Sequence, residues 1–507
     1  MRFPRLSRRW RSLSAILLVV GLAPAALHPP AAAGQDAAVV ASPVPSGVNW
    51  EPCADVPETE CAGLAVPVDP ARPDGPQLTL RLARVPALDP AQRRGALLLI
   101  PGGPGAGVEQ MLAGEWGMRD AHHVDEFRQR YDVVTFDPRG IGQSNPIRCD
   151  PDLLPEVIPP RDRAPSAAEF AALAEANAAF YESCFAATGE LMAHLSVNDT
   201  AADIEQIRQA LGEEEGLIAY GGSYGTAYGA AYLERYGEHV KAMVLDGVFD
   251  HSVDMPTLVT RNVLSAQETF DRFARWCAED EACALNGEDV GAVFDEVMTI
   301  APVTRTLVPQ ILAGGSRPDD GWWQLLAQVM ADVRDGDTAA LDSLTGVAAL
   351  GSTASDPWVV AGKNGLFPGV LCASFGPQND YEAIRAAGEA VAQQAPRFAW
   401  KFWDANPLAH GTAGVGDCVG WPLAATNPPH PLDVGAHPNV LVANPTHDPA
   451  TPLVNALAVW LQIPQARLLI ADVGGHQSLL LSDCAYQTMA RFLDDPSSVA
   501  TTTLCPN

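Results

Sequence analysis

The sequence predicts an α/β fold in which helices flank a mostly parallel sheet and a largely helical segment is inserted late in the chain. Short, continuously apolar runs at residues 96–100 and 217–220 are typical of strands covered on both faces, and segments with helical spacing alternate with such runs. From residue 251 to 430 strand-like runs become scarce while helical stretches continue, and the α/β alternation returns at 440–443. This change predicts a cap inserted into the core.

Taken in order, the first predicted elements form one edge of the sheet. Residues 62–69 and 77–85 alternate apolar and polar side chains, which indicates an antiparallel pair of strands. The buried strand at 96–100 runs into a glycine-rich turn at 101–105. The next strand, 131–136, ends at Asp137-Pro138-Arg139-Gly140, a tight connection whose charged pair we interpret as structural.

The later elements complete the core. The predicted order is a helix at 198–211, a strand at 217–220, a helix at 226–236 and a strand at 242–245, then beyond the insertion a strand at 440–443, a helix at 452–461 and a strand at 467–471. The 507 residues therefore divide into a first core part at 51–250, a cap at 251–430 and a second core part at 431–507.

The N-terminus has the pattern of an export signal. Arginines precede an apolar stretch at 13–27, and three alanines at 31–33 form a small-residue cleavage site before Gly34. The stretch is short for a membrane span, which needs about 20 residues. We expect a signal peptide at 1–33, cleaved between Ala33 and Gly34, and a flexible leader at 34–50. An uncleaved membrane anchor is the alternative.

The charge of the chain excludes several partners. It has 61 acidic and 32 basic residues, for a formal net charge of −29. Phosphate groups are bound by clustered positive charge, so neither nucleic acid nor an anionic membrane surface is an expected partner. We expect a protein that is secreted or associated with the cell envelope, without stable membrane insertion after cleavage. A monomer is expected, although the sequence does not define the oligomeric state.

Ten cysteines in an exported chain predict disulfides. Pairing neighbours along the sequence closes short or moderate loops without crossing, and other connectivities stay open. No pair has the C-x-x-C spacing with a second pair of ligands that a zinc site needs, so we expect neither a metal nor a cofactor. The predicted pairs are Cys53–Cys61, Cys149–Cys184, Cys277–Cys283, Cys372–Cys418 and Cys484–Cys505.

The segment Gly221-Gly222-Ser223-Tyr224-Gly225 lies between a predicted strand and a predicted helix. A serine at such a sharp turn is a nucleophile elbow, which needs small neighbours so that strand and helix approach closely. The turn at 101–105 also ends a buried strand, and its backbone N–H groups are placed to form an oxyanion hole. Simple chain reversal is the alternative for this turn.

A serine hydroxyl needs a base to act as a nucleophile, and this base is usually a histidine held by a carboxylate. After a nucleophile elbow the three residues follow one another along the chain in the order Ser, acid, His. Beyond the strand at 440–443 and its loop, His476 is the one histidine, just after the last predicted strand. Asp448 lies in the loop after strand 440–443. Asp472 is the rival acid, but it ends the strand that leads directly into His476. We therefore predict Ser223 as nucleophile, His476 as general base and Asp448 as acid.

Together these motifs resemble the secreted tripeptidyl aminopeptidase branch of the α/β-hydrolases, which is related to prolyl iminopeptidases. The resemblance implies the same triad, with the oxyanion held by the N–H groups of Tyr224 and Gly103. The sequence departs from the family pattern after the glycine turn, where Ala106-Gly107-Val108 follows. Pro101 stands where prolyl iminopeptidases have His. The resembling segments are PGGPG at 101–105, residues 131–144, GGSYGT at 221–226, VLDG at 244–247, DPATP at 448–452 and GH at 475–476.

The resemblance implies a secreted serine exopeptidase that releases short peptides, expected to be tripeptides, from free N-termini through an acyl-enzyme. Carboxylates of the insertion would bind the substrate amine, and Asp250, Asp254, Glu268 and Asp271 are the candidates. Three alternatives remain. They are hydrolysis of a non-peptide ester or amide, a single-residue aminopeptidase of the prolyl iminopeptidase type, and a non-catalytic binding protein, which would not require an intact Ser, Asp and His.

Overall fold

The computed structural model describes residues 47–54, 59–113, 126–155, 159–160, 163–300, 321–337, 339, 356–404 and 414–506. The predicted signal peptide at 1–33, its cleavage between Ala33 and Gly34, and nearly all of the leader at 34–50 lie outside these residues.

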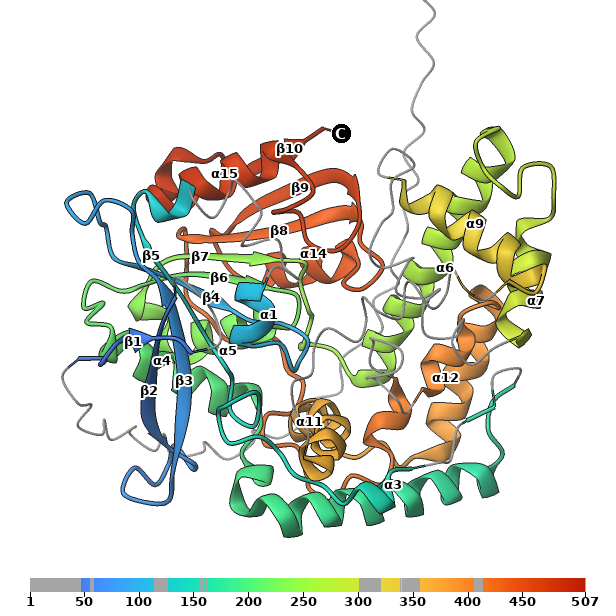
Figure 1. Cartoon of the computed structure of the whole chain (residues 1–507), viewed down its shortest axis with the longest axis horizontal. Coiled ribbons are helices and arrows are strands. Elements are labelled where there is room, and N and C mark those ends of the chain that lie inside the picture. Colours follow the sequence, from blue (N-terminus) through green and yellow to red (C-terminus); the bar gives the residue numbers. More distant parts are fainter. Residues whose placement is uncertain are drawn as a thin grey trace, which may run out of the picture. The chain divides into compact units, whose positions relative to one another are not determined.

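A single mixed sheet organises the described part of the chain (Figure 1). Its strand order is β1-β2-β3-β5-β4-β6-β7-β8-β9-β10. The pairs from β1 through β3 to β5 are antiparallel, and all other neighbours are parallel. The strands are β1 Glu51–Pro52, β2 Glu60–Pro67, β3 Gln77–Val85, β4 Ala96–Ile100, β5 Asp132–Phe136, β6 Leu217–Gly222, β7 Val240–Asp246, β8 Val440–His447, β9 Arg467–Gly474 and β10 Thr502–Cys505.

Helices cover both faces of the parallel part. Because side chains alternate along a strand, β4 directs Leu97 and Leu99 to the face covered by α15, and Leu98 and Ile100 to the face covered by α4 and α5. This explains why the central strands are continuously apolar. The helices are α1 Val108–Ala113, α3 Ala167–Thr188, α4 Val197–Ala210, α5 Gly225–Tyr236, α6 Met255–Glu279, α7 Val290–Ile300, α9 Trp322–Arg334, α11 Pro357–Phe375, α12 Tyr381–Gln394, α14 Leu453–Gln462 and α15 Asp483–Asp494.

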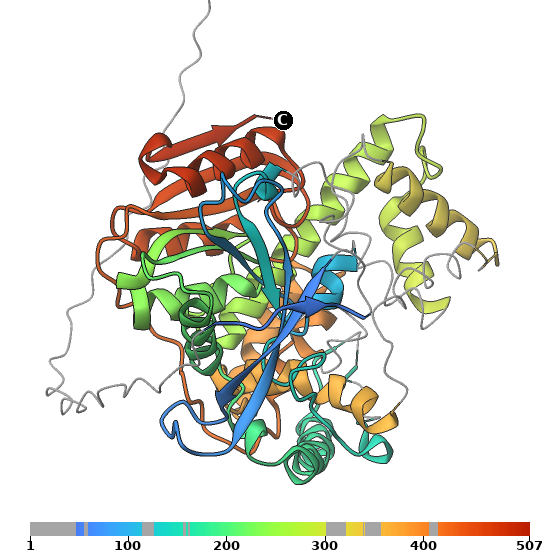
Figure 2. The ribbon, with the colours of Figure 1, turned by 60° about the vertical axis from the view of Figure 1, so that its left-hand side comes forward.

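The described residues between β7 and β8 form helices and no strand. Helices α6, α7 and α9 pack against one another (Figure 2). Aromatic rings fill their contacts, with the ring centroid of Phe270 4.6 Å from that of Phe294 and the ring centroid of Phe273 6.1 Å from that of Trp323. Helix α3 precedes residue 251, yet it packs against α11 of this segment. The domain boundaries at 250/251 and 430/431 stay a prediction.

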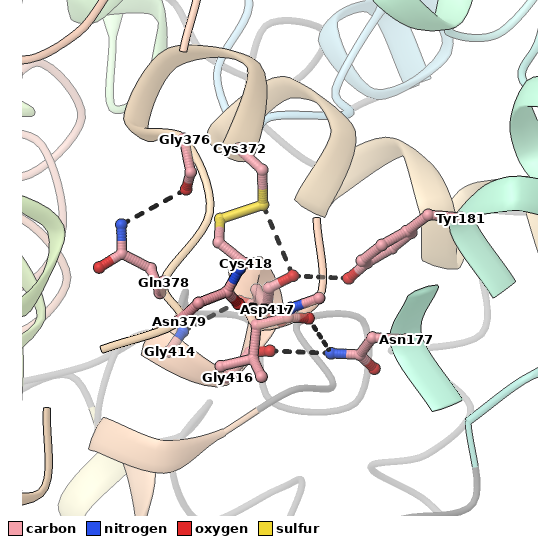
Figure 3. The surroundings of a disulfide bond; sticks show 12 residues. Asn177, Tyr181, Cys372, Gly376, Gln378, Asn379, Gly414, Gly416, Asp417 and Cys418 are labelled. Carbon is pink, nitrogen blue, oxygen red and sulfur yellow. Dashed lines mark hydrogen bonds between the residues drawn. A yellow bond between two sulfur atoms is a disulfide. The ribbon is translucent and has the colours of Figure 1, made fainter. Parts of the chain in front are cut away.

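The contact between α3 and the later chain centres on buried polar side chains beside a disulfide (Figure 3). Asn177 of α3 donates to the carbonyls of Gly416 and Val419 at 3.0 and 2.9 Å, and the Tyr181 hydroxyl donates to the carbonyl of Asp417 at 2.5 Å. These bonds satisfy buried backbone groups that would otherwise be costly to leave unpaired. They hold the segment around Cys418 in place.

The ten cysteines form five disulfides, between the same neighbours that the sequence pairs: Cys53–Cys61, Cys149–Cys184, Cys277–Cys283, Cys372–Cys418 and Cys484–Cys505. No helix within the described ranges combines the length and the apolar character of a membrane span.

The connection after β5 is held by its charged side chains, which bind different partners. Asp137 accepts the N–H groups of Val108 and Gln143 at 2.7 and 2.8 Å. Arg139 forms a two-pronged ion pair with Asp203 of α4 at 2.7 and 2.8 Å, and both side chains are almost completely buried. The connection therefore fastens the sheet to α4.

Candidate active site

Ser223 stands at a strained turn between β6 and α5. Its φ is +56°, in the left-handed region that non-glycine residues rarely adopt. The glycines around it allow close packing, because a Cβ on Gly225 would lie 2.3 Å from the carbonyl oxygen of Ile100 and one on Gly221 would lie 2.7 Å from that of Gly225. This is the geometry of a nucleophile elbow, with the serine held at the carboxyl end of a central strand.

Asp448 and His476 meet at the same edge of the sheet, from the loops after β8 and β9. His476 Nδ1 lies 2.9 and 3.0 Å from the two carboxylate oxygens of Asp448, which is fully buried. An ionised carboxylate accepts hydrogen bonds only, so Nδ1 carries the proton and Nε2 keeps a free electron pair. A histidine in this tautomer can accept a proton from a serine hydroxyl.

The electrostatics of this pair favour a protonated intermediate. Burial by itself lowers the pKa of His476, but the charge of Asp448, its hydrogen bond and the charge of Asp246 leave that pKa above its ordinary value. The Asp448 carboxylate is held in turn by N–H groups of Ala450 and Thr451 and by the Thr451 hydroxyl, at 2.8 to 3.0 Å. It therefore keeps its orientation without the histidine.

The glycine turn lies directly against the elbow. A Cβ on Gly102 would be 3.0 Å from Ser223 Cβ and 3.3 Å from the backbone nitrogen of Tyr224. Tyr224 is the N-cap of α5, where backbone N–H groups have no acceptor within the helix. Gly103, the other predicted donor, follows in the same turn with a φ of +107°. The two N–H groups predicted to bind an oxyanion thus come from neighbouring segments.

Comparisons with known proteins identify the family of the chain. Residues 95–311 match a family model described as alpha/beta hydrolase fold, and residues 408–505 match one described as TAP-like protein. A protein named Carboxylesterase B, of Mycobacterium tuberculosis, is 30% identical over an alignment of 508 positions, gaps included, that covers 93% of this chain and 94% of that protein. The chain belongs to the α/β-hydrolase family.

The relatives of this α/β-hydrolase carry different activities in their names. Serine protease Hip1 of Mycobacterium tuberculosis is 28% identical over 86% of each chain. Tripeptidyl aminopeptidase of Streptomyces lividans is 28% identical over 85% of this chain and 81% of that one. The fold and the family predicted from the motifs are confirmed. The protein is a serine hydrolase, related to esterases as closely as to peptidases.

Of the four predicted amine-binding carboxylates, three do not contact the loop that carries Asp448. Asp250 is fully buried and pairs with Arg261 at 2.7 Å. Asp254 caps α6 and lines an open pocket of about 480 Å³ that none of the triad residues lines. Asp271 accepts the side-chain amide of Gln267 at 2.9 Å.

The fourth carboxylate, Glu268, lies beside the loop that carries the acid. Its side chain is 49% exposed, and its carboxylate lies 3.0 Å from Nδ1 of His447, the residue before Asp448. Ser265, three residues earlier on α6, donates its hydroxyl to the Asp448 carbonyl at 2.8 Å. The contact of α6 with this loop has no sequence signal, because it joins residues about 180 positions apart.

Proposed function

We propose that this α/β-hydrolase is an exported serine exopeptidase that releases short peptides, tripeptides foremost, from free N-termini through an acyl-enzyme. The observation that carries the proposal is the hydrogen bond from His476 to the buried Asp448 beside the Ser223 elbow. The TAP-like match over residues 408–505, which contains both Asp448 and His476, supports the peptidase choice. Five disulfides support export, because such bonds persist in oxidising compartments.

The proposed mechanism assigns one role to each group. Ser223 Oγ attacks the peptide carbonyl while His476 takes its proton, and the N–H groups of Tyr224 and Gly103 bind the oxyanion. His476 then gives the proton to the leaving amine, and water hydrolyses the acyl-enzyme by the same steps. Each oxyanion donor contributes about 3 kcal/mol to lowering the barrier.

We propose Glu268 as the carboxylate that binds the substrate amine. It is the half-exposed candidate whose partner, His447, belongs to the acid loop. Because about half of the Glu268 side chain is exposed, its carboxylate stays accessible to an ammonium group of the substrate. Recognition of a free amine by the cap would restrict cleavage to chain ends.

The test compares chromogenic tripeptide, proline and acyl-ester substrates, with each peptide carrying a free or an acetylated amine, and with Ser223→Ala as the inactive control. Cleavage of the free tripeptide that acetylation stops supports the proposal. In Glu268→Gln, KM for the free tripeptide should rise, whereas Asp271→Asn on the same helix should leave it unchanged. Equal turnover of free and acetylated peptides would refute the exopeptidase assignment.

A second function, hydrolysis of non-peptide esters, is favoured by the 30% identical relative named Carboxylesterase B. Turnover of the ester alone in the same assay would support it.

A further inference from the structure

Asp246 occupies the centre of the catalytic edge without belonging to the triad. It ends β7, which lies between β6, leading to Ser223, and β8, leading to Asp448. Its side chain is completely buried. Its backbone carbonyl accepts the N–H of Ser223 at 3.0 Å. The backbone of Asp246 is therefore hydrogen-bonded directly to the nucleophile residue.

The carboxylate of Asp246 holds the loop that follows the base. It accepts the N–H of Ser478 at 2.8 and 2.9 Å, the Ser478 hydroxyl at 2.5 Å and the N–H of Leu479 at 2.9 Å. From β6, the Tyr220 hydroxyl donates to it at 3.0 Å. Residues 476–479 are thus fastened between two buried carboxylates, because Asp448 takes His476 Nδ1 and the N–H of Gln477.

The pattern of donors requires a carboxylate at this position. Both oxygens of Asp246 face donors, and a group that only accepts hydrogen bonds satisfies them all. An asparagine would turn an NH2 group against at least one donor, and a protonated acid would do the same with its O–H. Burial raises the pKa of the Asp246 carboxyl, while the hydrogen bonds from Ser478, Leu479 and Tyr220 act in the opposite direction and favour its charged form. A buried negative charge is costly unless it interacts with a positive one, and the His476 imidazolium that forms during the reaction supplies that positive charge.

We propose that Asp246 is a positioning residue that fixes the base-bearing loop on the nucleophile strand and stabilises the His476 imidazolium as it forms. The inference rests on the triad in the proposed function, but it is independent of the substrate class. The groups that face His476 are Asp448 from the loop after β8 and Asp246 from β7, and Tyr220 of β6 faces Asp246. The charge of Asp246 adds to that of Asp448 in raising the pKa of His476.

The experiment measures the second-order rate at which a fluorophosphonate probe labels Ser223, from pH 4 to pH 9. Labelling requires neutral His476, so the rate rises with pH through the pKa of this group. Asp246→Asn removes a charge and should move the midpoint to lower pH by about 1 unit, the low end of the effect of a nearby charge. The plateau should fall on the order of 10- to 100-fold, by analogy with the outer groups that orient metal-binding side chains.

Two serine variants separate positioning from a general structural effect. Ser478→Ala removes one hydrogen bond to Asp246 and leaves its charge, so the plateau should fall while the midpoint stays. Ser252→Ala is the matched control, because the Ser252 hydroxyl makes an equally short bond, 2.5 Å, to the buried Asp250 carboxylate. It should label at the wild-type rate.

The outcomes are distinct. An Asp246→Asn profile with the wild-type midpoint overturns the charge role, and a Ser478→Ala plateau equal to that of Ser252→Ala overturns positioning. The second comparison stands even if Asp246→Asn fails to fold, which near-UV circular dichroism reveals. Equal labelling of Ser223→Ala would refute the triad, and with it both proposals. Normal labelling without tripeptide cleavage would refute the exopeptidase while leaving the role of Asp246 supported.

Discussion

Replacing Asp448 by Asn is expected to remove most of the catalytic rate, because both carboxylate oxygens already accept fixed donors. Oδ1 accepts the N–H groups of Ala450 and Thr451, and Oδ2 accepts the Thr451 hydroxyl and the N–H of Gln477. An asparagine must turn its NH2 group against one of these pairs. Where the amide oxygen of the asparagine faces His476 Nδ1, that atom loses a charged acceptor. Where the NH2 group faces it, Nδ1 must accept a hydrogen bond from the amide.

The size of the effect follows from the tautomer. If Nδ1 accepts, the ring proton sits on Nε2, the nitrogen that must take the serine proton. In the serine-protease triad the same change lowers kcat about 10⁴-fold, which is about 5 kcal/mol in the barrier. We expect a loss of this order, since Asp448 is fully buried and lies 2.9 Å from Nδ1.

The assay is kcat/KM on whichever chromogenic acyl substrate the wild type turns over best. Asp472→Asn is the control, because Asp472 is the rival acid from the sequence and its side chain is exposed. An exposed substitution of this kind should change the rate by about twofold at most. A loss below about 10-fold in Asp448→Asn, or an equal loss in Asp472→Asn, would contradict the assignment of the acid.

Three further predictions concern stability, each measured by urea unfolding. Asp203→Ala should cost about 3–5 kcal/mol, because it leaves Arg139 buried without the carboxylate that it binds directly; the pair Arg139→Met with Asp203→Leu should cost less, and a larger cost would refute the reasoning. Burial lowers the pKa of His251 to about 4 from an ordinary 6.5, so the unfolded chain binds the extra proton and stability should fall by about 3 kcal/mol from pH 7 to pH 4, a loss that His251→Phe should abolish. Replacing both Cys484 and Cys505 by Ser should cost about 3 kcal/mol for their separation of 21 residues; an unchanged midpoint would show that the C-terminal strand needs no tether.

The sequence predicts those features whose signal is local. Apolar runs identify the central strands, and glycines around Ser223 identify the elbow, because burial and a left-handed φ act on neighbouring residues. The two-residue β1 and the late β10 were not predicted, since neither has an apolar run. A strand on the edge of a sheet buries too little surface to require a run of apolar residues.

Contacts between distant segments were also missed. Arg139 finds Asp203 on α4, and Asp246 holds a loop 232 positions later. In the sequence, Arg139 and Asp246 look like charged residues at turns and Asp203 like one on a helix, and only the folded arrangement shows that they are buried. The assignment of Asp448 over Asp472 was open to sequence reasoning because strand order limits which loops meet at one edge. Its catalytic role stays a prediction.

The disulfides have a consequence for how the chain is made. The ten cysteines pair consecutively, the first with the second, the third with the fourth and so on, with separations from 6 to 46 residues. When the polypeptide emerges with its N-terminus first, each disulfide can therefore close before the first cysteine of the following pair appears. An oxidant that simply joins thiols in order of emergence makes the native set, and a disulfide isomerase has no mispaired bond to correct.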